Sequence, residues 1–199
     1  MPFGPHTEPT AGQLRWQIYS SLSYGARGVL YFTYGTPKTF EFPRGGGLID
    51  AAGRRTRTWY DAQRINANIK QLGPTLMKLT STRVVRVDPE SDASKRLQGM
   101  ALRNLTPPNE FGGDPANDYL VGLFKHQDGR RGVLLTNYRF AYRARPTVEF
   151  DAPVDHVFEV NQQTGREVPV LDESPEIDGL QMSLDGGEGR LFLLPAHSP

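Results

Sequence analysis

The amino-acid sequence predicts an α/β segment followed by an all-β antiparallel sandwich. Within residues 14–37, an amphipathic helical pattern leads through a glycine turn into a short apolar run. A second helical pattern follows near residues 58–72, and from residue 81 onward short β-rich runs alternate with turn residues. A helix–strand–helix unit followed by a series of short strands indicates two domains, which are residues 1–80 and residues 81–199.

The first predicted helix has recognisable signals at both ends. Thr10 fits an N-cap, and Gln13 lies three residues further on, which completes a capping-box pattern. Gly25 fits the left-handed position that closes many helices. Between these ends, apolar residues recur at helical spacing and form one stripe, which consists of Leu14, Ile18 and Leu22.

The apolar run at residues 28–34 is the most informative stretch of the chain. It reads GVLYFTY and shows no alternation between apolar and polar residues, so neither face is suited to water. Strands of this kind belong to parallel sheets that are covered on both sides. A parallel strand needs parallel neighbours, and the sequence predicts no other such strand. The run therefore resembles the last part of a larger α/β architecture.

A loop and a second helix follow this run. Residues 35–55 are irregular, and in parallel α/β folds the loop after a strand's carboxyl end carries the ligand. The second helix is expected from about Thr58 to Leu72, because its apolar residues recur with a period near 3.6. Gly73 and Pro74 are expected to stop it, with one further turn over residues 75–79.

Short strands are predicted throughout the second domain. Asp128-Gly129 and Thr164-Gly165 stand between adjacent runs and indicate hairpins, while residues 106–117 form a long polar loop. Seven or eight strands at this spacing are typical of an antiparallel sandwich. The predicted strands are residues 83–87, 119–125, 132–137, 147–150, 156–160, 166–171, 180–184 and 190–194.

Composition excludes several classes of function. The net charge is only +1, from 23 basic and 22 acidic residues, so neither a nucleic acid nor a membrane is predicted as a partner. The absence of cysteine excludes disulfides and thiolate metal sites. The four histidines have no second ligand at metal-binding spacing, so neither a metal nor another cofactor is predicted. The N-terminal residues MPFGPHTEPT lack the pattern of a signal peptide, and the residues leave the compartment open.

Residues 15–34, RWQIYSSLSYGARGVLYFTY, resemble a recurring segment of (β/α)8-barrel glycoside hydrolases. The likeness is to the β-galactosidase-like group around family 42, in which this pattern is the seventh helix and the eighth barrel strand. Residues 47–53, GLIDAAG, with Thr58 and Tyr60, resemble the same group's last loop and eighth helix. Residues 122–124 and 187–192 resemble strands of the β-sandwich that often follows such barrels.

The resemblance implies that residues 1–80 are the last helix–strand–helix of a TIM barrel, followed by an accessory sandwich. Enzymes of this group hydrolyse O-glycosidic bonds of oligo- or polysaccharides with two carboxylates. Both carboxylates stand on earlier barrel strands, so no residue of this chain is assigned a catalytic role, and the isolated chain is expected to be inactive. The implied partners are a carbohydrate and the missing N-terminal part of the barrel, and the implied location is outside the cytoplasm.

Three residues near the end of the apolar run are candidates for substrate binding. Phe32 and Tyr34 can offer an aromatic face to a sugar ring, and Glu41 in the following loop can accept its hydroxyl hydrogens. The competing interpretation is that the aromatic residues belong to a core. Glu8, Glu41 and Asp50 also flank the run as a conceivable acid/base set, although loop carboxylates usually serve solubility.

Two other functions remain open at this point. The chain can be a non-catalytic carbohydrate-binding or interaction module, in which the sandwich binds and the helices support it. Alternatively, residues 138–145, YRFAYRAR, interleave aromatic residues with arginines in the manner of a single-strand nucleic-acid surface. The near-neutral net charge favours a solvated hairpin edge for that segment instead.

Overall fold

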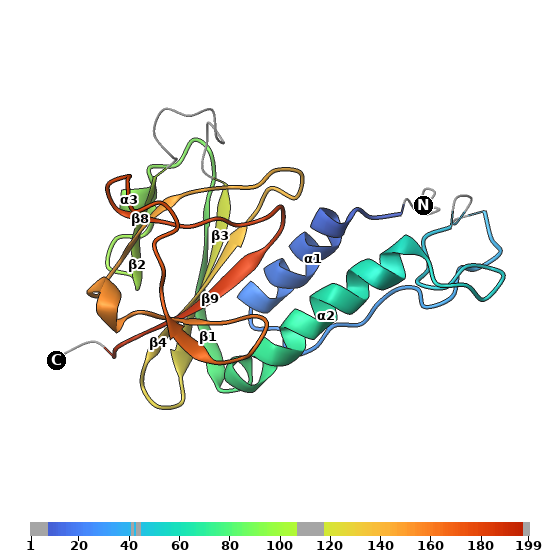
Figure 1. The fold of residues 1–199 in the computed structure, drawn as a ribbon, viewed down its shortest axis with the longest axis horizontal. Helices are drawn as coiled ribbons and strands as arrows, with labels where there is room; N and C mark the ends of the chain where they lie inside the picture. Colours follow the sequence, from blue (N-terminus) through green and yellow to red (C-terminus); the bar gives the residue numbers. More distant parts are fainter. Residues whose placement is uncertain (1–7, 41, 43–44, 107–117, 197–199) are drawn as a thin grey trace.

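A computed structural model describes residues 8–40, 42, 45–106 and 118–196 (Figure 1). Two antiparallel sheets form a sandwich, and a pair of helices lies against one of them. The helices are α1 (Ala11–Ser23) and α2 (Arg57–Leu76), with a short helix α3 (Ala93–Arg96) and a 3-10 turn η1 (Val154–His156) within the sandwich. The fold is therefore mostly antiparallel β-structure with few helices.

The larger sheet has six strands in the order β1-β3-β4-β9-β6-β7. Its strands are β1 (Leu79–Val87), β3 (Tyr119–His126), β4 (Arg131–Asn137), β6 (Phe158–Val160), β7 (Glu167–Pro169) and β9 (Gly189–Leu194). The smaller sheet has the order β2-β5-β8. Its strands are β2 (Leu102–Thr106), β5 (Thr147–Phe150) and β8 (Leu180–Gln181).

The central strands of the larger sheet are buried on both faces. In β4, Val133 and Leu135 point into the core between the two sheets, and Leu134 points into a second core beneath the helices. Leu134 is paired with Leu191 of β9, which lies in the same second core. This accounts for the nearly continuous apolar sequence of β4 and β9, because a strand covered on both faces has no polar side.

Helices α1 and α2 cover the outer face of the larger sheet. Leu14, Ile18 and Leu22 of α1 form the apolar stripe that the sequence predicts, and all three are buried. They pack with Leu72 of α2 and with Phe124 of β3. The helix pair and the sandwich therefore share one core across the predicted boundary near residue 80.

Glycines bring α1 unusually close to the sheet. A Cβ atom at Gly122 would stand 2.7 Å from the backbone oxygen of Ser23, and one at Gly189 would stand 2.6 Å from the Tyr19 ring. Gly187 has a φ of +72°, and its Cβ would meet the Gly12 carbonyl oxygen at 2.3 Å. Since only glycine permits such contacts, the sandwich is shaped to receive this helix.

The predicted ends of α1 are confirmed. The Thr10 hydroxyl accepts from the Gln13 amide at 3.2 Å, and the Gln13 side chain accepts from the Thr10 amide at 2.8 Å. At the other end Gly25, with a φ of +91°, donates to Leu22 at 2.8 Å, and Ala26 donates to Ser21 at 3.1 Å. These are the two hydrogen bonds of a Schellman motif.

Several details of the predicted elements need correction. Helix α2 passes Gly73 and Pro74 and ends at Leu76, because Met77 still donates to the Gly73 carbonyl at 2.9 Å. The further turn predicted over residues 75–79 is present only up to Lys78, which donates to Thr75 at 2.9 Å, because β1 begins at Leu79. Strand β2 and helix α3 were not predicted, and most of the predicted loop at residues 106–117 lies outside the described residues.

The other predicted strands are present within a few residues of the predicted bounds, and both predicted hairpin turns join paired strands. In the ranges that the structure describes, no helix combines the length and apolarity needed to cross a bilayer.

Candidate functional site

The apolar segment, residues 28–36, leaves α1 through its Schellman turn and runs back along the helix pair (Figure 1). None of residues 28–34 is assigned to a β-strand, which corrects the prediction of a regular strand there. The physical reason is that a strand is defined by hydrogen bonds to neighbours, and local sequence can supply only the apolar side chains. All named strands in the described ranges pair antiparallel, and the segment's parallel pairing there is limited to an isolated bridge between Gly35 and Ile49.

Alternate residues of the apolar segment face different surroundings. Tyr31 is half-buried against the helix core, and its hydroxyl donates to the Asn66 side chain of α2 at 2.7 Å. In contrast, Leu30, Phe32 and Tyr34 are 97%, 79% and 67% exposed. The segment therefore has one face against the helices and an opposite apolar face that is largely exposed.

The carboxyl end of the segment is joined to the following loop. Residues 47–49 lie between the end of the apolar segment and the residues before α2. The Leu48 amide donates to Thr33 at 3.1 Å, and the Ile49 amide donates to Tyr34 at 2.7 Å. On the other side, the Thr56 amide donates to Leu48 at 3.0 Å. Thr56 also caps α2, so the helix start fixes the position of this loop.

Two cavities adjoin the apolar segment. The first has a volume of about 370 Å³ and lies between α1 and the segment, with Gln17 and Ser21 of the helix opposite Tyr31 and Phe32. The second has a volume of about 510 Å³ and is lined by Thr36, Lys38 and Asp50 among others. Phe42 lines both cavities and stacks near Phe32, with 6.0 Å between ring centroids. The lining thus combines apolar surfaces with a few hydroxyl and amide groups, which suits a polar ligand with apolar faces.

The candidate carboxylates do not form an acid/base pair. The Glu8 carboxylate accepts from the Thr58 hydroxyl at 2.8 Å and lies 3.9 Å from Arg57. Asp50 accepts from the backbone and guanidinium of Arg54, and these bonds lower the pKa of its carboxyl. Both groups are engaged by neighbouring residues, and neither is placed beside the other as an acid and a base. Glu41 lies outside the described residues.

Residues 138–145, the aromatic–arginine segment, pack against the rest of the fold and do not form the edge of a hairpin. The Tyr138 ring centroid lies 5.2 Å from that of Trp16 in α1, and the Arg86 guanidinium lies over the Tyr138 ring at 4.5 Å. Phe140 also contacts Trp16 at 6.4 Å between centroids. Arg143 pairs with Asp185 at 2.7 Å. The contacts of Tyr138 and Phe140 with Trp16 hold α1 against the sandwich.

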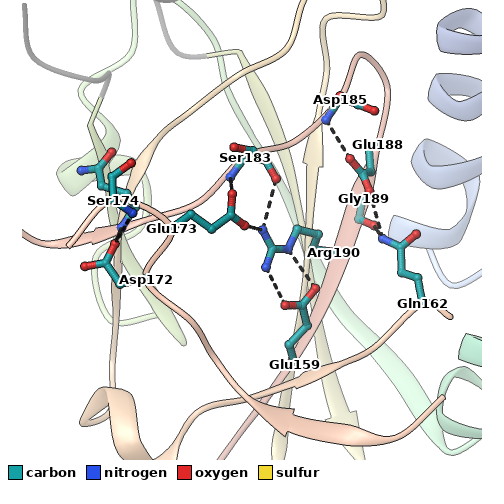
Figure 2. A network of polar contacts seen from close by, with 11 residues as sticks. Glu159, Gln162, Asp172, Glu173, Ser174, Ser183, Asp185, Glu188, Gly189 and Arg190 are labelled. Carbon is teal, nitrogen blue, oxygen red and sulfur yellow. Dashed lines mark hydrogen bonds and ion pairs between the residues drawn. The ribbon is translucent and has the colours of Figure 1, made fainter. Parts of the chain in front are cut away.

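A polar network surrounds Arg190 on the larger sheet (Figure 2). Its guanidinium lies 2.5 Å from Glu159 and 2.5 Å from Glu173. Burial by itself lowers the pKa of Arg190, but the two carboxylates raise it overall. Every charge in this trio has a partner, so the network serves structure.

Next to it, Gln162 connects the sandwich to the helices. It donates to the Gly189 carbonyl at 2.7 Å and accepts from Tyr19 at 2.9 Å and from Asn68 at 3.1 Å. Across the described ranges, no group of three His, Cys, Asp or Glu residues is placed to hold a metal ion.

Phe32 and Tyr34 lie on the same exposed face of the segment. Leu30 lies on that face as well, although it was not selected from the sequence. The signal that identifies it is simple: residues two apart in an extended chain point the same way. Phe42 was also missed, because nothing local distinguishes it from other loop aromatic residues. Searches with this chain found no matching family model, no matching curated protein and no matching solved structure.

Proposed function

We propose that this chain is the C-terminal portion of a barrel-type glycoside hydrolase that acts on O-glycosidic bonds of an oligo- or polysaccharide. In this proposal α1, the apolar segment and α2 are the last helix–strand–helix of the barrel. The sandwich is an accessory domain, and the catalytic carboxylates belong to sequence outside this chain.

The observation that carries the proposal is the largely exposed apolar face of the segment, above all Leu30. Leu30, Phe32 and Tyr34 are exposed on an extended stretch whose opposite face already packs on two helices. The strands of a (β/α)8 barrel are placed in the same way, with helices against one face and the packed barrel interior against the other. Burying a side chain such as Leu30 stabilises a fold by about 1.5–3 kcal/mol, so neighbouring strands would gain substantially by covering this face.

The loop arrangement supports the same function. In barrel enzymes the loops after the carboxyl ends of the strands form the active site. Here Tyr34 lies at that end of the segment, and residues 47–49 are bonded directly beside it. The two cavities lie around this loop and the adjoining helix ends. We infer that Phe32 and Tyr34 form part of the sugar-facing rim.

The experiment that tests this function compares two preparations. One is the purified 199-residue chain, and the other is the native polypeptide recovered through a tag placed after Pro199 in the gene. Each is assayed for release of p-nitrophenol from a panel of aryl glycosides. We expect turnover only in the second preparation, with a mass well above 22.2 kDa. Turnover by the purified short chain, or a tagged product of 22 kDa without activity, would overturn the proposal.

A carbohydrate-binding module is the second candidate, and the exposed Phe32 and Tyr34 favour it because exposed aromatic rings bind sugar faces. A glycan array with the wild type and Tyr34→Ala separates the two binding surfaces. Loss of binding in the variant assigns recognition to the apolar segment, and retained binding assigns it to the sandwich.

A further inference from the structure

One cleft, named the basic cleft, is lined by residues of β1, β3 and β4 and of the connection between α3 and β2. It has a volume of about 460 Å³ and an apolar floor that includes Met100, Ala101 and Leu123. Four cationic side chains also line it, and these are Arg83, Lys125, Arg130 and Arg131. So many cations around one small cleft are unusual for a chain of net charge +1.

The strand register explains how three of these cations come together. Arg83 pairs with Leu123, and Lys125 pairs with Arg131, so the three residues occupy adjacent strands β1, β3 and β4. Alternation along each strand places them on the same face as Val85, Leu123 and Val133, which line the core between the sheets. The three cationic side chains lie where the core between the two sheets meets solvent.

Two of the four cations are neutralised within the protein. Arg131 lies 2.6 Å from Asp151, and Arg130 lies 2.6 Å from Glu167. The side chains of Arg83 and Lys125, in contrast, make no ion pair or hydrogen bond with the part of the chain that the structure describes. Lys125 lies opposite Arg131 across the strand pair, and because Asp151 already pairs with Arg131, Lys125 keeps its charge for another partner.

We propose that the basic cleft binds a carboxylate-bearing saccharide, with the carboxylate between Arg83 and Lys125 and the ring against the apolar floor. The anion would supply the two cations with the partner that they lack in the described chain, and charge-assisted hydrogen bonds would orient it. The choice of a saccharide rests on the proposed function, whereas the requirement for an anion rests on the cleft itself. The sandwich would then give the enzyme its preference for acidic glycans.

The test measures binding of a galacturonic acid oligomer to the 199-residue chain by isothermal titration. The ligand arms are this acid, its methyl ester and acetate. The protein arms are the wild type, the double variant Arg83→Gln/Lys125→Gln, and a matched control, Lys70→Gln/Arg145→Gln. The control removes the same charge from two exposed side chains outside the cleft.

We expect the wild type and the control to bind the acid, and the Arg83→Gln/Lys125→Gln variant to bind about tenfold more weakly or not at all. The methyl ester and acetate should bind poorly. No binding of the acid, equal binding by both double variants, or equal binding of acid and ester would overturn the proposal. Acetate binding as strong as that of the oligomer would reduce the cleft to an anion site and overturn the saccharide assignment. None of these results depends on the glycosidase assay, so each proposal can fail separately.

Discussion

Single glycines decide how closely α1 approaches the sandwich. At Gly189 there is no room for a side chain, since a Cβ would meet the Tyr19 ring at 2.6 Å. Gly73 in α2 is different, because a Cβ there would have nothing within 4 Å. Comparing alanine substitutions at the two positions therefore separates the cost in stability of the close contact from the effect of glycine's conformational freedom.

Replacing Gly189 with alanine is expected to lower the free energy of unfolding by about 1–3 kcal/mol, because the added methyl group overpacks the helix–sheet contact. Gly73→Ala is the control and should change it by less than about 1 kcal/mol, because alanine favours a helix but a side chain directly before Pro74 opposes one. Urea unfolding of both variants measures this. Equal effects at the two positions would show that the close contact of α1 is not real.

Arg190 is the best-paired charge in the described chain's polar network. Its side chain is 11% exposed and that of Glu159 is 15% exposed. Arg190→Gln should therefore destabilise the fold by about 3 kcal/mol, because it leaves a largely buried carboxylate without its cation. Exposed Arg54→Gln should change stability by less than about 1 kcal/mol. If denaturant unfolding shows similar losses for both, the Arg190 network does not support the sandwich.

Glu188 contributes a pH dependence of opposite sign to most carboxylates here. Burial raises its pKa above the ordinary value of 4.5, although the Asp185 amide bond opposes the shift. The folded state therefore holds this proton more tightly than the unfolded state. Its contribution to stability is complete at pH values below 4.5 and is lost as the pH rises through the raised folded pKa.

Glu188→Gln is consequently expected to stabilise the protein at pH 8 relative to the wild type, with a smaller gain at pH 4. The glutamine oxygen can still accept the Asp185 amide hydrogen, which the carboxylate accepts at 2.7 Å. Unfolding measured at both pH values tests this. A gain that is larger at pH 4 than at pH 8 would contradict the assigned direction of the pKa shift.

At the scale of elements, predictability follows the range of the interactions involved. The caps of α1 were predictable from Thr10, Gln13 and Gly25 because every hydrogen bond there spans a few residues. Strand β2 was not predictable, because its sequence LRNLT is short and only weakly apolar. It becomes a strand by pairing with β5, more than forty residues later in the sequence.

The apolar segment shows the same dependence on distant partners in the opposite case, where a strand was predicted and none is present. Its apolar character and extended path were evident from the sequence, but strand assignment requires partners. The candidate rim was predictable at Phe32 and Tyr34, since both lie near the end of the run. Leu30 became identifiable only when alternate residues were seen to face away from the helices. The basic cleft was hidden because only the register shows that Arg83 lies opposite Leu123, two residues along β3 from Lys125.

The two faces of the segment predict different mutational effects in the 199-residue chain. Leu30→Ser should change the free energy of unfolding by less than about 0.5 kcal/mol, because Leu30 is 97% exposed. Tyr31→Ala should lower it by about 1–3 kcal/mol through lost packing and a lost hydrogen bond to Asn66. Should Leu30→Ser be as damaging as Tyr31→Ala, the outer face would have to be covered within this chain.

At the scale of the whole molecule, four layers follow one another. The smaller sheet packs on the larger sheet, the helix pair packs on the larger sheet's other face, and the apolar segment lies along the helices. Each layer covers an apolar face of the next, and the last leaves Leu30, Phe32 and Tyr34 largely exposed. This order places β4 and β9 at the centre of the fold and leaves an exposed apolar surface on one side.

The shared core also bears on how the two predicted domains behave alone. Residues 81–199 without the helices would expose Leu134, Leu191 and Leu193 to water. That fragment is therefore expected to bind the dye ANS and to aggregate, whereas the 199-residue chain gives a single cooperative unfolding transition. A soluble fragment with a sharp transition of its own would show that the sandwich does not need α1 and α2.

The most direct test of the central claim is amide hydrogen exchange at residues 28–34, measured in the 199-residue chain and in the native tagged polypeptide. Strand neighbours protect amides, so the account predicts fast exchange in the short chain and exchange slowed by orders of magnitude in the native polypeptide. Slow exchange in the short chain, or fast exchange in both, would contradict the claim that this segment is a barrel strand whose partners lie elsewhere.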